Sequence, residues 1–194
     1  MSTTFYDNSA DVVVGTNLFD AAGNFCTLAD SFSTPAGTLW TITTLQLKLQ
    51  RTAGAGTSKI NVDVYLDNGA SNPGSLYQNL ATNFSIVFPD GASHLITVTL
   101  GTPLPLGALT RYWIAVSDPT NTGAGGLAWN TANLAGGDVG TANESNAGLP
   151  AASAFCAFVS LNNASAPFIM KLTGDVFSFG GGGSSPVAIG VWGR

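Results

Sequence analysis

The side chains of this chain that could carry acid–base or nucleophilic chemistry are few. Its one histidine, His94, follows Ser93 and the turn sequence Pro89–Gly91. A serine–histidine–acid site needs its serine and histidine to converge, whereas neighbouring residues of a strand point to opposite faces. The chain also lacks a Gly-x-Ser-x-Gly nucleophile elbow. We therefore interpret His94 as a surface turn residue and not as a catalytic base.

Paired carboxylates are the other arrangement that we considered. Glycoside hydrolysis needs two of them across a substrate bond. The candidates are Asp7, Asp30, Asp63, Asp67 and Glu144, and Glu144 is the single glutamate of the chain. None of them stands in an aromatic-flanked acidic motif, and the Gly180–Gly183 run lacks the strand–loop–helix setting of a phosphate loop. We expect a protein that is not an enzyme.

Calcium is the metal that the sequence best accommodates. Asp7 and Asn8 offer hard oxygen ligands, although they lack the alternating acidic spacing of a dedicated calcium loop. The two residues suit either an ion or a structural cap. Asp67-Asn68-Gly69 is interpreted as a hairpin turn. No cofactor other than calcium is expected.

Cys26 and Cys156 permit one intramolecular disulfide. Closing a loop of about 130 residues would stabilise the fold by about 5 kcal/mol in the chain-entropy model. The alternative is two buried, reduced thiols that behave as small apolar side chains. Even together with His94, the one histidine of the chain, the two cysteines are too few to form a zinc site.

Aromatic side chains are the remaining candidates for contact with a ligand or partner. Trp113 stands in an apolar strand-like run and is expected in the core. Trp129, in a long glycine-rich region, and Trp192, near the C-terminus, are the better contact candidates. Tryptophan is enriched at protein interfaces, and it also stacks on sugars, so both kinds of contact are open.

Low charge is the dominant property of the composition. Only 9% of the residues are charged, with a net charge of −5, whereas an ordinary globular domain has roughly 25%. The basic residues are scattered, so no basic stripe predicts nucleic acid binding. No stretch reaches the roughly 20 apolar residues of a membrane span, and the first residues do not resemble a signal peptide. Export after removal of a signal, or release by lysis, would both fit an extracellular protein.

Alternation with a period of two residues dominates the chain. Strands are predicted over 39–49, 60–66, 94–100, 111–117 and 167–173, separated by turns such as 67–69, 72–74 and 89–91. No segment shows a sustained helical period with caps. The sequence thus predicts an all-β protein with a single antiparallel β-sandwich of jelly-roll type.

Two regions interrupt this pattern. Residues 118–149, rich in Gly, Ala, Asn and Thr, predict a long loop. The domain is expected to span 1–176, and 177–194 to form a Gly-rich tether followed by a short apolar strand. Three alternating apolar residues, Val187, Ile189 and Val191, together with Trp192 on the opposite face, make this strand a candidate to pair with a sheet edge. A frayed terminus is the alternative.

Several segments together resemble the choice-of-anchor R domain, a β-rich module of exported bacterial proteins. They are Phe5–Asn8, Leu28–Thr34, Val62–Gly69 followed by Asn72–Leu76, Leu109–Ser117 and Phe168–Gly174. The likeness covers roughly residues 5–175, in order. It implies a β-rich fold in an extracellular or envelope setting, without catalytic residues. The chain departs from the pattern of that family at both ends: its first residues do not resemble a signal peptide, and at the C-terminal end a Gly tether and a short apolar strand are expected in place of an apolar helix and a basic cluster.

These observations predict a structural protein. A neutral surface rich in Ser, Thr, Asn and Gly is easily dehydrated and favours contact with other surfaces. We expect a β-sandwich that associates with itself and with other capsid or assembly proteins, on a virion or elsewhere outside the cell, as a capsid decoration, cement or tail component of a bacteriophage. The alternative is a secreted or cell-surface module that binds glycans and serves in adhesion.

Overall fold

The computed structural model describes residues 2–21, 24–25, 27–69, 73–119, 126–132 and 167–178. Within these ranges the regular elements are all strands, and each strand pairing is antiparallel. The strands are β1 (Thr3–Asp7), β2 (Val13–Ala21), β3 (Asn24–Phe25), β4 (Leu28–Ser33), β5 (Thr38–Arg51), β6 (Gly56–Asp67), β7 (Pro73–Phe88), β8 (Ser93–Leu106), β9 (Arg111–Ser117), β10 (Leu127–Ala132) and β11 (Met170–Ser178). The predicted all-β class is thereby confirmed. No helix with the length and hydropathy of a membrane span occurs in these ranges.

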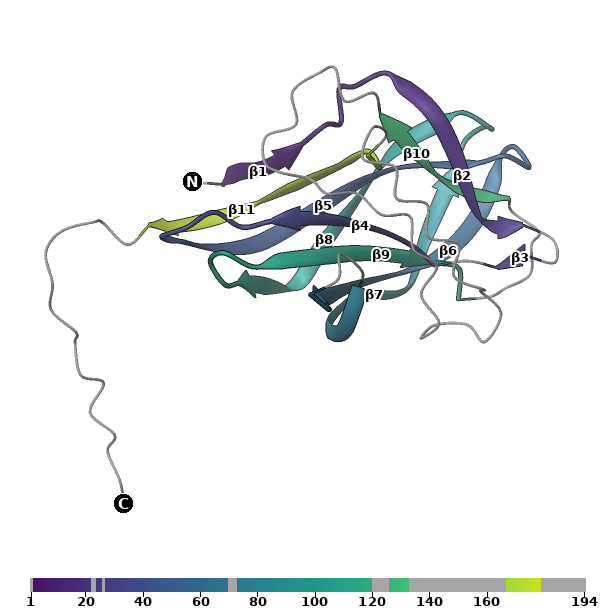
Figure 1. The fold of residues 1–194 in the computed structure, drawn as a ribbon. Coiled ribbons are helices and arrows are strands. Elements are labelled where there is room, and N and C mark those ends of the chain that lie inside the picture. Colours follow the sequence, from purple (N-terminus) through teal and green to yellow (C-terminus); the bar gives the residue numbers. More distant parts are fainter. Residues whose placement is uncertain are drawn as a thin grey trace, which may run out of the picture.

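The strands form two sheets. Sheet A has the order β1-β11-β5-β10-β2-β3, with β8 on β5, and sheet B has the order β4-β9-β6-β7. Figure 1 shows β1, β11 and β5 of sheet A above β4 and β9 of sheet B, as two layers. This two-layer antiparallel arrangement agrees with the predicted sandwich, while its jelly-roll connectivity stays a prediction.

β5 is the central strand of sheet A. β8 pairs with one of its edges, and the other edge is shared by two strands in succession. Residues 38–47 of β5 pair with β11, and residues 49–51 pair with β10. Between these two stretches, the Lys48 amide donates to the carbonyl of Ile169 at 3.0 Å. β10 and β11 therefore meet beside Lys48, and the chain of Pro167–Ile169 closes the junction.

The main core lies between the two sheets and follows the period of two residues. Leu45, Leu47 and Leu49 of β5 point inward, as do Ile60, Val62 and Val64 of β6, and all six side chains have no exposed area. Aromatic rings close the end of the core near the start of β5, where Trp40 stacks on Phe5. The alternation expected for both strands is confirmed.

Sheet B also carries a buried cluster on its outer face, separate from the main core. Ala29, Tyr65, Trp113 and Ala115 form it, all between 0% and 4% exposed. The expected burial of Trp113 is confirmed, but its ring lies in this second cluster and not between the sheets. This explains why every residue of β9 from Tyr112 to Ser117 is buried.

The structure corrects three sequence predictions about element boundaries. The predicted loop 118–149 contains β10, because its six residues pair with β2 and the first three of them also pair with β5. The turn predicted over 72–74 is shorter, since Pro73 already pairs with Asp67. Phe177 and Ser178, placed in the tether by sequence, pair with Leu39 and Thr38 as the end of β11.

Candidate functional site

His94 lies at the turn between β7 and β8, as the sequence predicted. Its Nε2 atom is 2.7 Å from Oδ1 of Asp90, and the side chain of Asp90 is exposed whereas that of His94 is half-buried. The bond from His94, together with a bond from the Ala92 amide, lowers the pKa of the Asp90 carboxyl. Ser93 pairs with Gln50 and His94 with Leu49, so the two neighbours alternate in the β5–β8 ladder. The pair orders a surface turn.

Asp7 is held by partners within the chain. Its Oδ2 atom lies 2.8 Å from Nζ of Lys171, and its Oδ1 atom accepts from the amide and the hydroxyl of Ser9. Burial raises the pKa of Asp7, but the bonds from Lys171 and Ser9 and the Lys171 charge outweigh it, so the pKa is lowered. The carboxylate thus caps the turn after β1, which favours the structural alternative over a calcium ligand. Within the described ranges, no group of three metal-ligating side chains comes together.

Asn8 and Asp30 form what we call the polar clamp, together with the backbone of Phe168–Met170. Asn8, 2% exposed, donates to the carbonyl of Phe168 at 3.0 Å and accepts from the amide of Met170 at 2.7 Å. From sheet B, Asp30 reaches across the core and accepts from the amide of Phe168 at 2.8 Å, while its other oxygen accepts from Ser31. The clamp therefore joins the N-terminal strand, sheet B and the start of β11.

Sequence reasoning found both clamp residues but not their role. Asp30 was considered as a possible catalytic carboxylate, and Asn8 as a calcium ligand or a cap. Asp30 is fully buried. A useful signal is present at Leu28–Ser33, where Asp30 is the one charged residue of a short strand segment. Such a residue is normally satisfied by buried hydrogen bonds.

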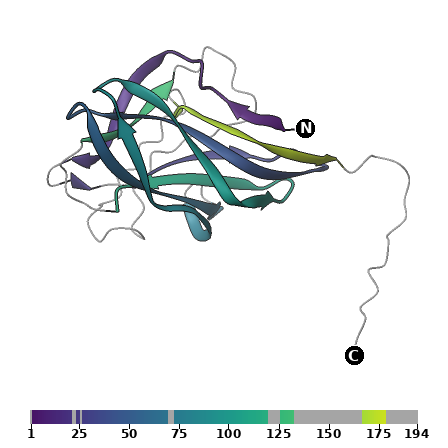
Figure 2. The ribbon, with the colours of Figure 1, turned by 180° about the vertical axis from the view of Figure 1, so that it is seen from behind.

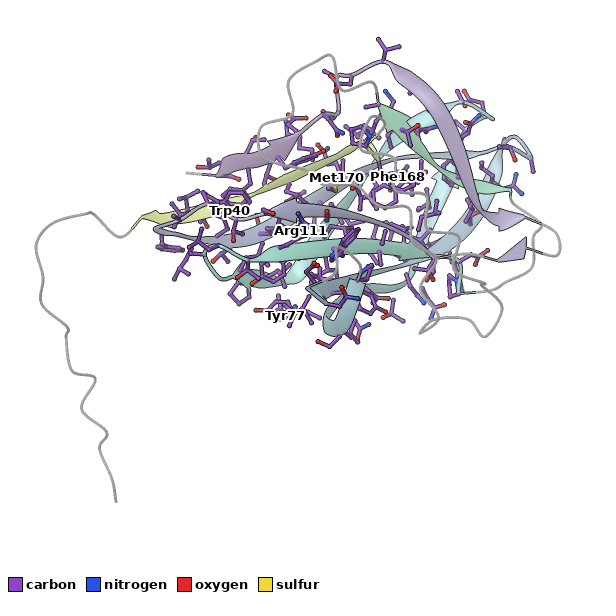
Figure 3. The ribbon with its side chains drawn as sticks, in the orientation of Figure 1. Trp40, Tyr77, Arg111, Phe168 and Met170 are labelled. Atoms are coloured by element: carbon purple, nitrogen blue, oxygen red, sulfur yellow. The ribbon has the colours of Figure 1, made fainter. Side chains whose placement is uncertain are left out.

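Trp129 was predicted as a contact residue in a loop, and this prediction is wrong. The ring belongs to β10, has no exposed area, and stacks on Phe168 with ring centroids 4.4 Å apart. Its Nε1 atom donates to the carbonyl of Ile169 at 3.0 Å. Figure 3 shows Phe168 and Met170 side by side among the packed side chains of the core. The residue is a core anchor for the β10–β11 junction.

The other predicted site residues lie outside the described ranges. They are Cys26, Cys156, Val187, Ile189, Val191 and Trp192. The disulfide and the pairing of the C-terminal segment therefore stay predictions.

The longest exposed backbone margins belong to β7 and β8, and we call them the open edge. β7 (Pro73–Phe88) pairs with β6 alone among the described strands, and β8 (Ser93–Leu106) pairs with β5 alone. A short turn over 89–92 joins them, so their free margins lie on the same side of the sandwich near that turn. β8 lies at the back of the view in Figure 1 and at the front in Figure 2.

The open edge has almost no charge. Between Asn68 and Thr110, Asp90 is the one Asp, Glu, Lys or Arg residue, and it lies in the turn. Natural edge strands are usually protected by charged side chains, especially lysine, because an unpaired row of N–H and C=O groups templates pairing with another chain. Here β7 and β8 lack that protection along their whole length.

Exposed apolar side chains lie along the open edge. Leu76 and Tyr77 near the start of β7 are 50% and 40% exposed, and Val87 and Leu95 beside the 89–92 turn are 74% and 41% exposed. Three further apolar side chains, Leu80, Phe84 and Ile96, pack against the main core and are only partly covered. Contact at this edge would therefore remove apolar surface from water as well as pair backbone groups.

The two ends of the open edge differ in how regular they are. Near the 89–92 turn, residues 84–88 of β7 pair with β6 without a register shift, and residues 93–99 of β8 pair with β5 in the same way. At the other end, β7 has several register shifts and β8 contains Pro103 and Pro105. Bulges and prolines discourage strand addition. The regular half, 84–88 and 93–99, is thus the part best suited to accept another strand.

The other margins of the sheets are short or closed. β1 has five residues and carries the Asp7–Lys171 ion pair, and β3 has two residues. β4 has six residues, of which the first five are buried. The open edge therefore stands out by its length, its exposure and its lack of charge.

Comparisons with known proteins add no family to this picture. No protein-family model matches the chain, and no curated protein or solved structure matches it significantly. The resemblance to the choice-of-anchor R domain stays a prediction from sequence.

Proposed function

We propose that this chain is a non-enzymatic structural protein that self-associates in an extracellular assembly, as a bacteriophage virion component of the capsid-decoration, cement or tail type. One observation carries the proposal: among the described strands, β7 and β8 are two long edge strands with exposed apolar side chains and without a charged residue. Self-association uses such a surface, whereas a monomeric protein normally blocks it.

Two further properties favour self-association over a monomeric state. The chain carries 9% charged residues, so repulsion between copies is weak. Val87 and Leu95 would each contribute about 1 kcal/mol if a partner covered them, on the usual scale of apolar burial. We propose a virion as the setting because the tendency to associate and the low charge of the chain both suit a protein that packs against other β-rich subunits.

The test is the size of the full chain in solution and its dependence on the open edge. We expect light scattering to show oligomers of the natural chain that grow with concentration, and electron micrographs to show regular assemblies. The double substitution Val87→Lys/Leu95→Lys should return the protein to a monomer, because lysine on an edge must be desolvated when a strand is added.

A matched control separates edge chemistry from a general gain of charge. Val12 and Leu109 are 75% and 78% exposed and lie outside both edge strands. The double substitution Val12→Lys/Leu109→Lys should leave association unchanged. A natural chain that stays monomeric at millimolar concentration, or an edge variant that associates like the natural chain, would sink the proposal.

Glycan binding remains the second candidate function, with a different contact residue. Trp129 is unavailable, but Tyr77 is exposed on the open edge, where its ring lies 5.4 Å from that of Tyr112 and its hydroxyl donates to the carbonyl of Pro105. An exposed ring beside polar groups is the kind of surface on which sugars stack. A glycan array that responds to the natural chain and not to Tyr77→Ala would favour this function over self-association.

A further inference from the structure

The structure and the sequence together indicate which segment of a neighbouring copy binds the open edge. We propose that the C-terminal segment 186–192 of one copy adds as a strand to β8, along residues 93–99 of the regular half of the open edge, of a neighbouring copy. This inference rests on the proposed self-association and specifies its partner and geometry. The open edge is the acceptor, and the segment is the donor.

The chemistry of donor and acceptor matches. Residues 186–192 contain no charged side chain, and Val187, Ile189 and Val191 alternate so that all three share one face of a strand. The acceptor likewise has no charge, and the partly covered side chains Phe84 and Ile96 in the regular half belong to the margin of the main core. An added strand supplies backbone hydrogen bonds, and its alternate side chains fill apolar positions that the edge leaves open.

Chain length favours a neighbouring copy over the chain's own edge. β11 ends at Ser178, which pairs with Thr38 at the start of β5, whereas the regular half of β8 lies beside the other end of β5, where Leu95 pairs with Lys48. The near end of the regular half of β8 is Thr99, which pairs with Thr44. The run from Thr38 to Thr44 spans about 20 Å, and a strand added beyond β8 lies about 14 Å from β11 across the sheet, so the linker would have to cover about 25 Å. A Gly/Ser-rich linker over 179–186 reaches about 15 Å on average. Docking on the same copy would thus stretch the linker well beyond its average length, whereas a neighbour has no such requirement.

This geometry predicts a head-to-tail assembly. Donor and acceptor are different surfaces, so the contact is heterologous and each copy can give one strand and receive one. Such contacts close into a ring or continue as a filament. An edge-to-edge contact between two β8 strands would instead stop at a twofold dimer.

The decisive experiment mixes two full-length variants with complementary defects. The tail variant Val187→Lys/Ile189→Lys/Val191→Lys keeps the acceptor edge, and the edge variant Val87→Lys/Leu95→Lys keeps the donor segment. Each alone should be monomeric by light scattering. Mixed in equal amounts, they should form a one-to-one heterodimer that grows no further, since only one productive contact remains. Lysine in both variants excludes attraction between opposite charges as the cause.

Controls keep the outcome specific. The variant Ser184→Lys/Ser185→Lys/Ala188→Lys adds the same charge to the linker and the segment, at positions outside the alternating apolar set, and should assemble as the natural chain does. Circular dichroism and the melting temperature of each variant check that the domain is folded.

Each result points to one conclusion. If the tail variant assembles like the natural chain while the edge variant does not, self-association stands and the donor assignment is overturned. If both variants are monomeric and their mixture stays monomeric, the segment does not add to a neighbour's edge. In that case, if the tail variant has a lower melting temperature than the natural chain and the edge variant does not, the segment packs on the domain of its own copy. A natural chain that never associates would overturn the proposed function itself.

Discussion

The strands at the two sides of the sandwich differ in their length, in their polar contacts and in their charge. On the side of β1, β4 and β11, short strands are tied together by an ion pair and by the polar clamp, with Asn8 and Asp30 satisfying backbone groups of Phe168 and Met170. On the side of β7 and β8, long strands end in an uncharged margin with exposed leucine, valine and tyrosine. Polar side chains are thus used to close one side, and the other is left able to pair.

This difference separates residues that hold the fold from residues available for contact. The closed side contains buried polar groups whose loss leaves orphaned backbone atoms, which is costly. The open edge contains side chains that are already exposed, so substitutions there should alter association and leave folding nearly unchanged. Substitutions on the two sides should therefore have separate effects, on stability and on association.

The largest effect is expected at the β10–β11 junction. Trp129→Ala removes a fully buried indole that stacks on Phe168, and we expect the free energy of unfolding to fall by about 3–5 kcal/mol. Tyr77→Ala on the open edge removes a ring that is 40% exposed and should cost about 1 kcal/mol. Urea unfolding of both variants makes the comparison. Equal losses of stability in the two variants would contradict the division between residues that hold the fold and residues of the open edge that are available for contact.

Two glycines offer a finer comparison of the same kind. A Cβ atom at Gly174 of β11 would collide with the backbone oxygen of Thr41, whereas a Cβ at Gly101 of β8 meets no atom within 4 Å. We expect Gly174→Ala to lower stability by about 1–3 kcal/mol, since the neighbouring backbone must shift. Gly101→Ala should be neutral or slightly stabilising, because alanine restricts the unfolded chain. Thermal melts of the two variants give the answer.

The polar clamp can be dissected at Asn8. Asn8→Ala leaves the amide of Met170 and the carbonyl of Phe168 without their side-chain partner and should cost about 1–3 kcal/mol. Gln46→Ala breaks an exposed bond to Thr97 and should cost less than about 0.5 kcal/mol. Asn8→Asp keeps the acceptor for Met170 but places a buried carboxylate oxygen against the carbonyl oxygen of Phe168, so it should cost at least as much as alanine. If Asn8→Ala is as stable as the natural chain, the polar clamp does not stabilise the fold.

The smallest effect concerns acid stability, where Asp7 and Asp63 should act in opposite directions. The lowered pKa of Asp7 means that its contribution is present above the unfolded value, near 3.9, and is lost as the pH falls through the folded value. For Asp63, burial raises the pKa despite a bond from Asn79, so its contribution is present below the unfolded value and is lost as the pH rises through the folded one. Each effect should stay below about 1 kcal/mol because Asp7 is partly exposed and Asp63 is partly compensated.

Stability measured between about pH 2 and pH 6 tests these signs. Asp7→Asn should flatten the loss of stability at the acid end, and Asp63→Asn should flatten the loss toward the upper end. The reverse pattern would show that the two environments have been assigned the wrong way round.

The sequence predicted those strands whose residues alternate and are bounded by turns. β9 was predicted with its observed bounds, and β5, β6 and β8 within longer strands. β10 was missed because all six of its residues are buried, so it lacks a wet face and a period of two. β7 was missed because most of its residues are exposed and its register shifts break the pattern.

The candidate site was predictable in part. The lack of charge was visible in the sequence, and it led to the prediction of a surface that makes contacts. Its location was not, because only the sheet order shows that β7 and β8 are edges. The clamp could not be predicted either, since Asn8 and Met170 are 162 positions apart and no local pattern relates them.

The pairing of β1 with β11 also constrains when this protein can fold. Asp7 pairs with Lys171, so β1 has no place in the sheet until β11, about 160 residues further along the chain, has been made. At about 5–20 residues per second, that delay is roughly ten to thirty seconds. Throughout it, the consecutive strands β7 and β8, which contain no Asp, Glu, Lys or Arg, are already synthesised and can pair with other nascent chains. Contacts of such long range also slow the final step. Production of the protein in cells should therefore depend on chaperones that cover these two strands during synthesis, and lower growth temperature should raise the soluble yield.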